Sequence, residues 1–361
     1  ATASSGQVLP FLTSISGQNY SAFSNSMVQG AQLFMNNFAL QVGGGSVGPR
    51  AIRGGAGRVA LAEACVVACQ TFTPPTWGAW GGALGGTGTV GTGAITGSTT
   101  YNVGGFAAGL DRLLTPNFLA GVTVGYTTGR QWVSGFSGQS SSDTFQVGLY
   151  GSFFEDALYL DGMVSYAYSS NQMWRNIAIP NLQQRTAQGL TGANQFFGQI
   201  EGGYRFTLGG AALGATAMPF ITPFARLQGF TGTQNAFTET GAQSLNLSVA
   251  AQTTNSLRSV IGVQLGGSMD FGWRDRLYAQ LRLGWSHEYA DVTRPVTASL
   301  AGAPSFLFTT YSATPTRDGA VVGLQMTTEV AQASSIYLRY EGNIAGQDST
   351  HALTAGLRMT W

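Results

Sequence analysis

The segment LYAQLRLGWSH, residues 277–287, alternates strictly between two kinds of side chain. One parity holds Leu277, Ala279, Leu281, Leu283 and Trp285, and the other holds Tyr278, Gln280, Arg282 and Ser286. Successive side chains of a β-strand point to opposite faces of the sheet. The pattern therefore predicts a strand with one apolar face and one polar face.

Segments at residues 158–168, 196–206 and 336–343 repeat this alternation, and their charged residues share parity with Gln, Ser, Thr or Gly. An arginine facing the bilayer midplane of a membrane barrel would cost about 2–4 kcal/mol. A soluble β-sandwich, the alternative, would carry far more charge on its outer face. We therefore predict that the apolar face meets lipid. The residues predicted to line a lumen are Asp161, Glu201, Arg205, Arg226, Arg282, Arg339, Glu341 and Arg358.

We predict about twelve strands, at residues 77–87, 100–111, 118–128, 144–154, 158–169, 194–206, 220–231, 257–270, 277–288, 319–329, 336–342 and 352–361. Most links on one side are short, and those on the other are expected to be long, at 129–143, 170–193, 232–256 and 289–318. Outer-membrane barrels have tight periplasmic turns and long external loops, so both ends of the barrel are expected in the periplasm. Aromatic girdles are expected from Phe118, Tyr126, Tyr159, Tyr168, Trp273, Trp285 and Trp361.

The composition agrees with a lipid-facing surface. Only 9% of the 361 residues are charged, whereas a soluble domain uses about a quarter. The basic residues are all Arg and are scattered, and the net charge is +1, so a nucleic-acid partner is not expected. No window of about twenty residues is apolar enough for a transmembrane helix. A membrane protein without such helices must be a closed barrel, because backbone polar groups in lipid need partners within the protein.

A single amphipathic helix is predicted near residues 19–42. Apolar residues recur there at steps of three and four, including Phe23, Met27, Phe34 and Phe38, while Asn25, Gln29, Gln32 and Asn36 lie on the other side. At 1.5 Å per residue the helix would be about 35 Å long, close to the height of a membrane barrel. An uncharged polar face suits a helix enclosed in a pore, and an ordinary packing helix is the alternative.

These patterns divide the chain into three parts: residues 1–42 with the pore helix, a Gly-, Pro- and Arg-rich linker at 43–76, and a barrel at 77–361. The start of the chain, ATASSGQVLP, shows no signal peptide, so the chain is expected to be processed or a fragment. Cys65 and Cys69 lie in the linker, and their spacing matches no common zinc or redox motif. A small disulfide loop in an oxidising compartment is predicted, with two inert thiols as the alternative.

Three stretches resemble the translocator unit of a classical autotransporter, the type V secretion system of Gram-negative bacteria. Residues 9–38, LPFLTSISGQNYSAFSNSMVQGAQLFMNNF, are similar to the passenger end and pore helix of that family. Residues 77–129 are similar to its first three strands, which begin with Trp and continue through Gly-rich segments. The ending HALTAGLRMTW, residues 351–361, resembles its closing strand.

The resemblance implies an antiparallel up-and-down outer-membrane β-barrel of twelve strands, plugged by one helix, that exports its own N-terminal passenger to the cell surface. It implies outer-membrane lipids, periplasmic chaperones and the barrel-assembly machinery as partners, with Leu357, Met359 and Trp361 as the assembly signal. Some members cut their passenger between adjacent Asn residues of the helix. Asn36 and Asn37 are adjacent, but LFMNNFALQV lacks charged neighbours, so polar helix-face residues are the favoured interpretation.

Other chemistry finds little support in the sequence. Residues 86–91 match G-x-G-x-x-G, but no helix follows, so no dinucleotide site and no cofactor are predicted. His287-Glu288 lacks the second His of a zinc-protease helix. We predict a translocator without enzymatic activity. The alternatives are a passive pore with a plug helix and, less favoured, a rim hydrolase built on His287 or His351 with Asp291, Asp143 or Asp348.

Overall fold

The structure, a computed structural model, describes residues 12–38, 76–91, 97–136, 138–178, 183–208, 216–270, 276–311, 313–331 and 333–361. Within them, a short 3-10 helix, η1 (Gln18–Tyr20), leads into one long α-helix, α2 (Ser21–Phe38). The helix agrees with the segment predicted near residues 19–42, of which 39–42 lie outside the described residues. No helix in these ranges has the length and hydropathy that crossing a membrane requires.

Twelve long strands close into one antiparallel barrel, which confirms the predicted fold. They are β1 (Trp77–Val90), β2 (Thr99–Thr115), β3 (Phe118–Val133), β4 (Gly138–Glu155), β5 (Leu158–Ile177), β6 (Arg185–Tyr204), β8 (Thr216–Gln234), β11 (Gln252–Asp270), β12 (Arg276–Glu288), β15 (Asp318–Ala331), β16 (Ser334–Ala345) and β17 (Asp348–Thr360). Each strand pairs with the next one in this series, and the short β7 (Phe206–Thr207) pairs with β8.

The barrel closes where its first and last strands meet. β1 pairs with β17 in unbroken register from Gly78 opposite Thr360 to Thr89 opposite Ser349. Two further backbone hydrogen bonds, of 3.0 and 3.1 Å, join Trp77 and Trp361. Since this seam pairs the two strands that would otherwise be edges, the wall has no open edge between them.

The two faces of the barrel wall carry different side chains: apolar residues are exposed on the outside, and polar residues are buried on the inside. Along β12, Leu281, Leu283 and Trp285 are exposed by 37–49%, whereas Gln280 and Arg282 are buried. Large apolar residues remain exposed all around the barrel, which is the surface expected to meet lipid. Of the predicted girdle, Phe118, Tyr126, Tyr168, Trp285 and Trp361 are exposed, and Trp273 lies outside the described residues.

The girdle assignment of Tyr159 is wrong. Its side chain is buried and donates a hydrogen bond of 2.9 Å to Glu201. Tyr159 has the parity opposite to that of Leu158 and Leu160, both of which are exposed, so it points inward. The alternation within the strand, and not the aromatic character of one residue, decides which face a side chain takes.

The predicted long loops at 129–143 and 170–193 are also wrong. Pairing between β3 and β4 continues to Gln131 opposite Ser140, and β5 and β6 pair as far as Ile177 opposite Arg185. In these extensions polar residues such as Arg130 and Asp143 occupy outward positions. Beyond the lipid the outer face no longer needs apolar side chains, so the alternation ends while the backbone pairing continues.

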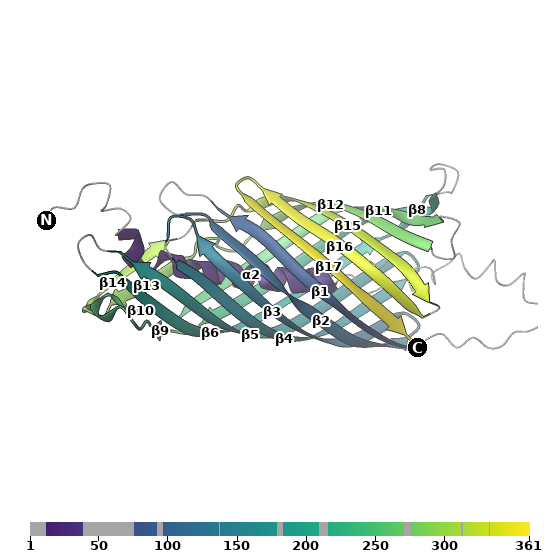
Figure 1. The fold of residues 1–361 in the computed structure, drawn as a ribbon. Coiled ribbons are helices and arrows are strands. Elements are labelled where there is room, and N and C mark those ends of the chain that lie inside the picture. Colours follow the sequence, from purple (N-terminus) through teal and green to yellow (C-terminus); the bar gives the residue numbers. More distant parts are fainter. Residues whose placement is uncertain are drawn as a thin grey trace, which may run out of the picture.

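The other two long loops build a separate small sheet. It contains β9 (Phe237–Thr238), β10 (Leu247–Val249), β13 (Pro295–Leu300) and β14 (Ala303–Tyr311), in the order β14-β13-β10-β9, and a 3-10 turn, η3 (Gln243–Leu245), precedes β10. Leu247, Val249 and Val296 form a buried cluster with Tyr20 and Phe23 of the helical segment. This sheet lies at the end of the barrel opposite to the C-terminus (Figure 1).

Glycines of the wall let the helix approach closely. A side chain at Gly125 of β3 would place its Cβ 2.8 Å from the Phe34 ring of α2, well inside van der Waals contact. At Gly229 of β8 the same atom would meet nothing within 4 Å. Space for the helix therefore depends on a missing side chain at Gly125.

We predict that Gly125→Leu destabilises the refolded protein by about 1–3 kcal/mol, the usual cost of overpacking. Thermal unfolding in detergent micelles measures the change, with Gly229→Leu as the matched control that enters open space. Equal unfolding midpoints for the two variants would show that the helix does not pack on the wall at Gly125.

Candidate functional site: a helix enclosed in a polar lumen

The lumen is filled by α2, which packs mainly against β1–β6 and β8 (Figure 1). Its apolar residues Phe23, Met27, Phe34 and Phe38 are buried. The Phe34 ring lies 6.0 Å from that of Phe197, edge to face, and the Phe38 ring lies 5.2 Å from that of Tyr150. Aromatic contacts of this kind fix the helix against the inner wall.

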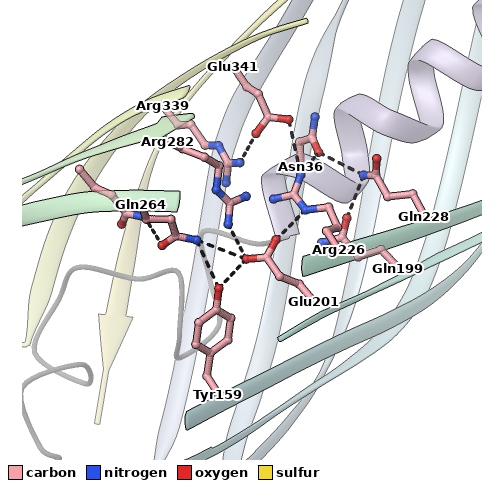
Figure 2. A network of polar contacts seen from close by, with 11 residues as sticks. Asn36, Tyr159, Gln199, Glu201, Arg226, Gln228, Gln264, Arg282, Arg339 and Glu341 are labelled. Carbon is pink, nitrogen blue, oxygen red and sulfur yellow. Dashed lines mark hydrogen bonds and ion pairs between the residues drawn. The ribbon is translucent and has the colours of Figure 1, made fainter. Parts of the chain in front are cut away.

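The polar side of α2 meets a cluster of buried charged residues and one tyrosine, which we call the central network. It consists of Tyr159, Glu201, Arg226, Arg282, Arg339 and Glu341, from five different strands (Figure 2). Glu201 accepts hydrogen bonds from Arg226 Nε at 2.6 Å and from the Tyr159 hydroxyl at 2.9 Å, and it forms an ion pair with Arg282. Glu341 pairs with Arg339 in the same way.

Asn36 connects the helix to the central network. Its Oδ1 accepts hydrogen bonds from Arg226 Nη1 at 3.0 Å and from Gln228 Nε2 at 3.3 Å, as Figure 2 shows. The same Arg226 Nη1 lies 3.5 Å from Glu341 Oε1. An amide can accept these bonds without bringing a further charge into the lumen. The adjacent Asn37 is fully buried, and its side-chain amide has no hydrogen-bond partner among the described residues.

A second network crosses the barrel seam. The sequence analysis predicted its Arg358 as a lumen residue but missed Asp111, Tyr150 and Trp80. Both carboxylate oxygens of Asp111 on β2 bind Arg358 Nη2 of β17, at 2.6 and 2.7 Å. The Tyr150 hydroxyl donates to Asp111 at 2.9 Å, and Trp80 Nε1 donates to Tyr150 at 2.8 Å. The parity of β2 could have revealed the inward direction of Asp111. Its partner lies 247 residues away, and closure of the barrel brings the two together.

A third network fixes the other end of the helical segment. Arg175 of β5 is paired with Glu239, which follows β9, and the Tyr20 hydroxyl donates to the same carboxylate at 2.6 Å. Arg175 also donates to the backbone carbonyl of Ser14 at 2.6 Å. These residues were missed because the segments that carry Arg175 and Glu239 were expected to be solvated loops.

Two of the predicted lumen residues lie outside these networks. Asp161 on β5 is buried and accepts a hydrogen bond of 2.5 Å from Ser152. Arg205 lies between β6 and β7, near the end of the barrel that holds the C-terminus, with its guanidinium 4.4 Å from the centre of the Phe220 ring. Cys65 and Cys69 lie outside the described residues.

A family model described as "Autotransporter beta-domain" matches residues 79–341, most of the barrel. The chain belongs to the autotransporter β-domain family. Together with the closed barrel, this membership places it in the bacterial outer membrane.

Solved structures of autotransporter barrels share the fold. The translocator domain of NalP from Neisseria meningitidis is 15% identical and matches 95% of this chain and 99% of its own, with a TM-score of 0.62. The β-domain of the Bordetella autotransporter Brka is 20% identical and matches 79% of this chain and 100% of its own, with a TM-score of 0.58. A curated protein described as an extracellular serine protease of Serratia marcescens is 27% identical over 296 residues, which cover 79% of this chain. The match spans about a quarter, 26%, of that protein's length.

The histidines of this autotransporter barrel do not assemble the rim site considered above. His287 Nδ1 lies 2.8 Å from Asp318 Oδ1, and His351 Nδ1 lies 2.8 Å from the Tyr340 hydroxyl. Asp291 binds the backbone N–H and hydroxyl of Thr293, which lower the pKa of its carboxyl. Asp143 binds Tyr126, and Asp348 accepts bonds from the backbone N–H groups of Gly91 and Thr316. The predicted acids therefore bind other groups, and within the described ranges no hydrogen bond or ion pair joins either histidine to Asp143, Asp291 or Asp348.

We predict that Glu201→Gln lowers the free energy of unfolding by about 3 kcal/mol, because it leaves the buried Arg226 and Arg282 without their carboxylate. Urea unfolding of the protein folded into lipid vesicles measures this loss. The matched control is Arg130→Gln, at an exposed outward position, which should leave the midpoint unchanged. Equal midpoints for both variants would contradict a structural role of the central network.

Proposed function

We propose that the chain is the translocator unit of an autotransporter, which carries its own N-terminal passenger through the barrel to the cell surface. One observation carries this proposal: a segment of the chain itself runs through the lumen along its length. The start of that segment contacts the small sheet of β9, β10, β13 and β14, where Gln18 Nε2 donates to the backbone carbonyl of Tyr311 at 2.5 Å. Its last residue, Phe38, packs on Tyr150, whose hydroxyl binds Trp80 near the start of β1.

The direction of the helix supports outward export. Long loops of outer-membrane barrels face the cell exterior, and short turns and chain ends face the periplasm. The residues that precede Gln18 are therefore delivered outside, and the strands that follow Phe38 begin at the periplasmic side. The polar inner wall can hydrate a chain in transit, and afterwards its hydrogen-bonding groups hold the helix.

Transport of this kind requires no nucleotide site in the barrel. We propose, from family membership, that passenger folding outside the cell draws the chain forward. The central network and the Arg175–Glu239 pair would then retain the helix after passage, because Asn36, Tyr20 and Ser14 hold it at both ends. The passive pore and the rim hydrolase are not favoured. The reason is that the chain belongs to the autotransporter β-domain family.

Assembly partners extend the same proposal. Leu357, Met359 and Trp361 are exposed on the outer face of the last strand and its end, which supports a role as the signal read by the barrel-assembly machinery. Periplasmic chaperones would protect the apolar outer face before insertion. We further propose that the chain divides at residues 42 and 76, that Cys65 and Cys69 form a disulfide, and that the Asn36–Asn37 bond stays intact.

We predict that deletion of residues 1–42 raises single-channel conductance in planar bilayers several-fold, because the helix fills the lumen of the intact chain. The full chain is the control, and vesicle binding shows that both proteins insert. An unchanged conductance in an inserted, heat-modifiable barrel would contradict the plug.

We also predict that a small folded reporter joined to the N-terminus, behind a signal peptide, becomes cleavable by protease added to intact cells. The matched control carries the same reporter on the barrel without residues 12–38, and it should remain protected. Protection of the reporter on the full chain, with the barrel correctly inserted, would contradict export.

A further inference from the structure

One cavity of the lumen is lined by three arginines, none of which forms an ion pair with a carboxylate among the described residues. It lies beside Gln29 and Gln32 of α2, on the side where β11, β12, β15, β16 and β17 form the wall, and it has a volume of about 60 Å³. Arg258, Arg294 and Arg317 all line it. The latter two belong to the long segment between β12 and β15, so the cavity lies at the loop end of the lumen.

Arg258 is the most isolated of the three. Its side chain is only 7% exposed, yet it makes no hydrogen bond or ion pair with any residue that the structure describes. The nearby Glu341 is engaged by Arg339 and Arg226 of the central network. Glu341 and Glu288 attract the Arg258 guanidinium only without direct contact. Its buried N–H groups therefore lack an acceptor among the described residues, an arrangement that favours a bound anion.

Arg294 faces the same cavity, and only one of its guanidinium nitrogens, Nη1, donates hydrogen bonds to the described residues. It is 4% exposed, and its Nη1 donates to the backbone carbonyls of Asp291 and Thr293 at 2.8 and 3.1 Å. Its Nε has no partner within the described part of the chain. Arg317 likewise donates to backbone carbonyls, those of Glu288 and Ala290, at 2.9 and 2.8 Å.

The two carboxylates that line the cavity, those of Glu288 and Asp348, accept hydrogen bonds from groups other than the three arginines. Glu288 accepts from the backbone N–H groups of Leu257 and Ala290, at 2.8 and 3.0 Å, and from the Ser256 hydroxyl at 2.5 Å. Asp348 accepts from the backbone N–H groups of Gly91 and Thr316. Neither forms an ion pair with the three arginines among the described residues.

We propose that this cavity binds a small oxyanion, with Arg258 and Arg294 as its ligands and Arg317 at its entrance. Guanidinium groups match the paired oxygens of phosphate, sulfate and carboxylate, which favours these over a spherical anion. Two sources share this chemistry: a free inorganic ion entering from outside, and a carboxylate side chain of a polypeptide in the lumen. The proposal rests on the cavity alone and does not require export.

The test measures the thermal unfolding midpoint of the full chain refolded in zwitterionic detergent. Sodium phosphate replaces sodium chloride at constant ionic strength in one arm, and sodium acetate replaces it in the other. Binding to the folded state raises the midpoint in a saturable manner. Arg258→Gln and Arg294→Gln should each lose at least half of this rise, and the outward-facing control Arg130→Gln should retain it.

A rise with phosphate identifies a free inorganic ion, and a rise with acetate alone identifies a carboxylate; either supports the site. The proposal is overturned if neither anion raises the midpoint, or if the rise is equal in all four proteins, which would be a general salt effect. Should Arg258→Gln fail to refold, Arg294→Gln in the loop decides the outcome.

Discussion

Closure of the sheet is the constraint on which the remaining structure depends. In hydrocarbon, each unpaired backbone N–H or C=O costs several kcal/mol, so a strand edge within the bilayer is not tolerated. The pairing of β1 with β17 removes the edges of the first and last strands, and the Asp111–Arg358 ion pair links β2 to β17 across β1 on the lumen side. The alternation of side chains follows from closure, because every strand then has one face toward lipid and one toward the lumen.

The buried polar groups of the inner face require hydrogen-bond partners, and the helix supplies some of them. Glu201, Arg226 and Arg282 satisfy one another in part, and Asn36 supplies a further acceptor from the helix. Phe34 and Phe38 cover the aromatic part of the same wall. The helix is thus held on both its polar and its apolar side, which suits the proposed role of a segment that stays in the lumen after export.

The sequence predicts what the bilayer dictates and little beyond it. Residues 277–287 reveal two faces because lipid selects one of them, and the same selection gives the strand count. Arg175 and Glu239 escaped prediction because they lie where the strands leave the lipid and both faces become polar. Their ion pair depends on a small sheet whose strands include β9 and β10. These strands are too short to show a periodic pattern in the sequence.

Ion pairs between residues far apart in the chain could not be predicted from the sequence either. The inward direction of Arg358 can be read from its strand, but its contact with Asp111 follows only from the barrel seam. The inward Tyr159 shows the reverse case, in which the alternation was informative and the expectation of an aromatic girdle prevailed over it. Residues 39–75 lie outside the described residues, so the disulfide between Cys65 and Cys69 stays a prediction.

The most direct measurement of the central claim is a cross-link between helix and wall in the outer membrane of living cells. The chain would carry Asn36→Cys and Gln228→Cys, with Cys65 and Cys69 replaced by Ser, and a short thiol-specific cross-linker would be added. Asn36 and Gln228 are in hydrogen-bond contact, so we expect an internally linked chain with altered migration on a denaturing gel. The control pairs Asn36→Cys with Leu227→Cys on the outer face and should stay unlinked. Linkage in neither protein, with the barrel inserted and both thiols reactive after unfolding, would show that the helix does not occupy the lumen.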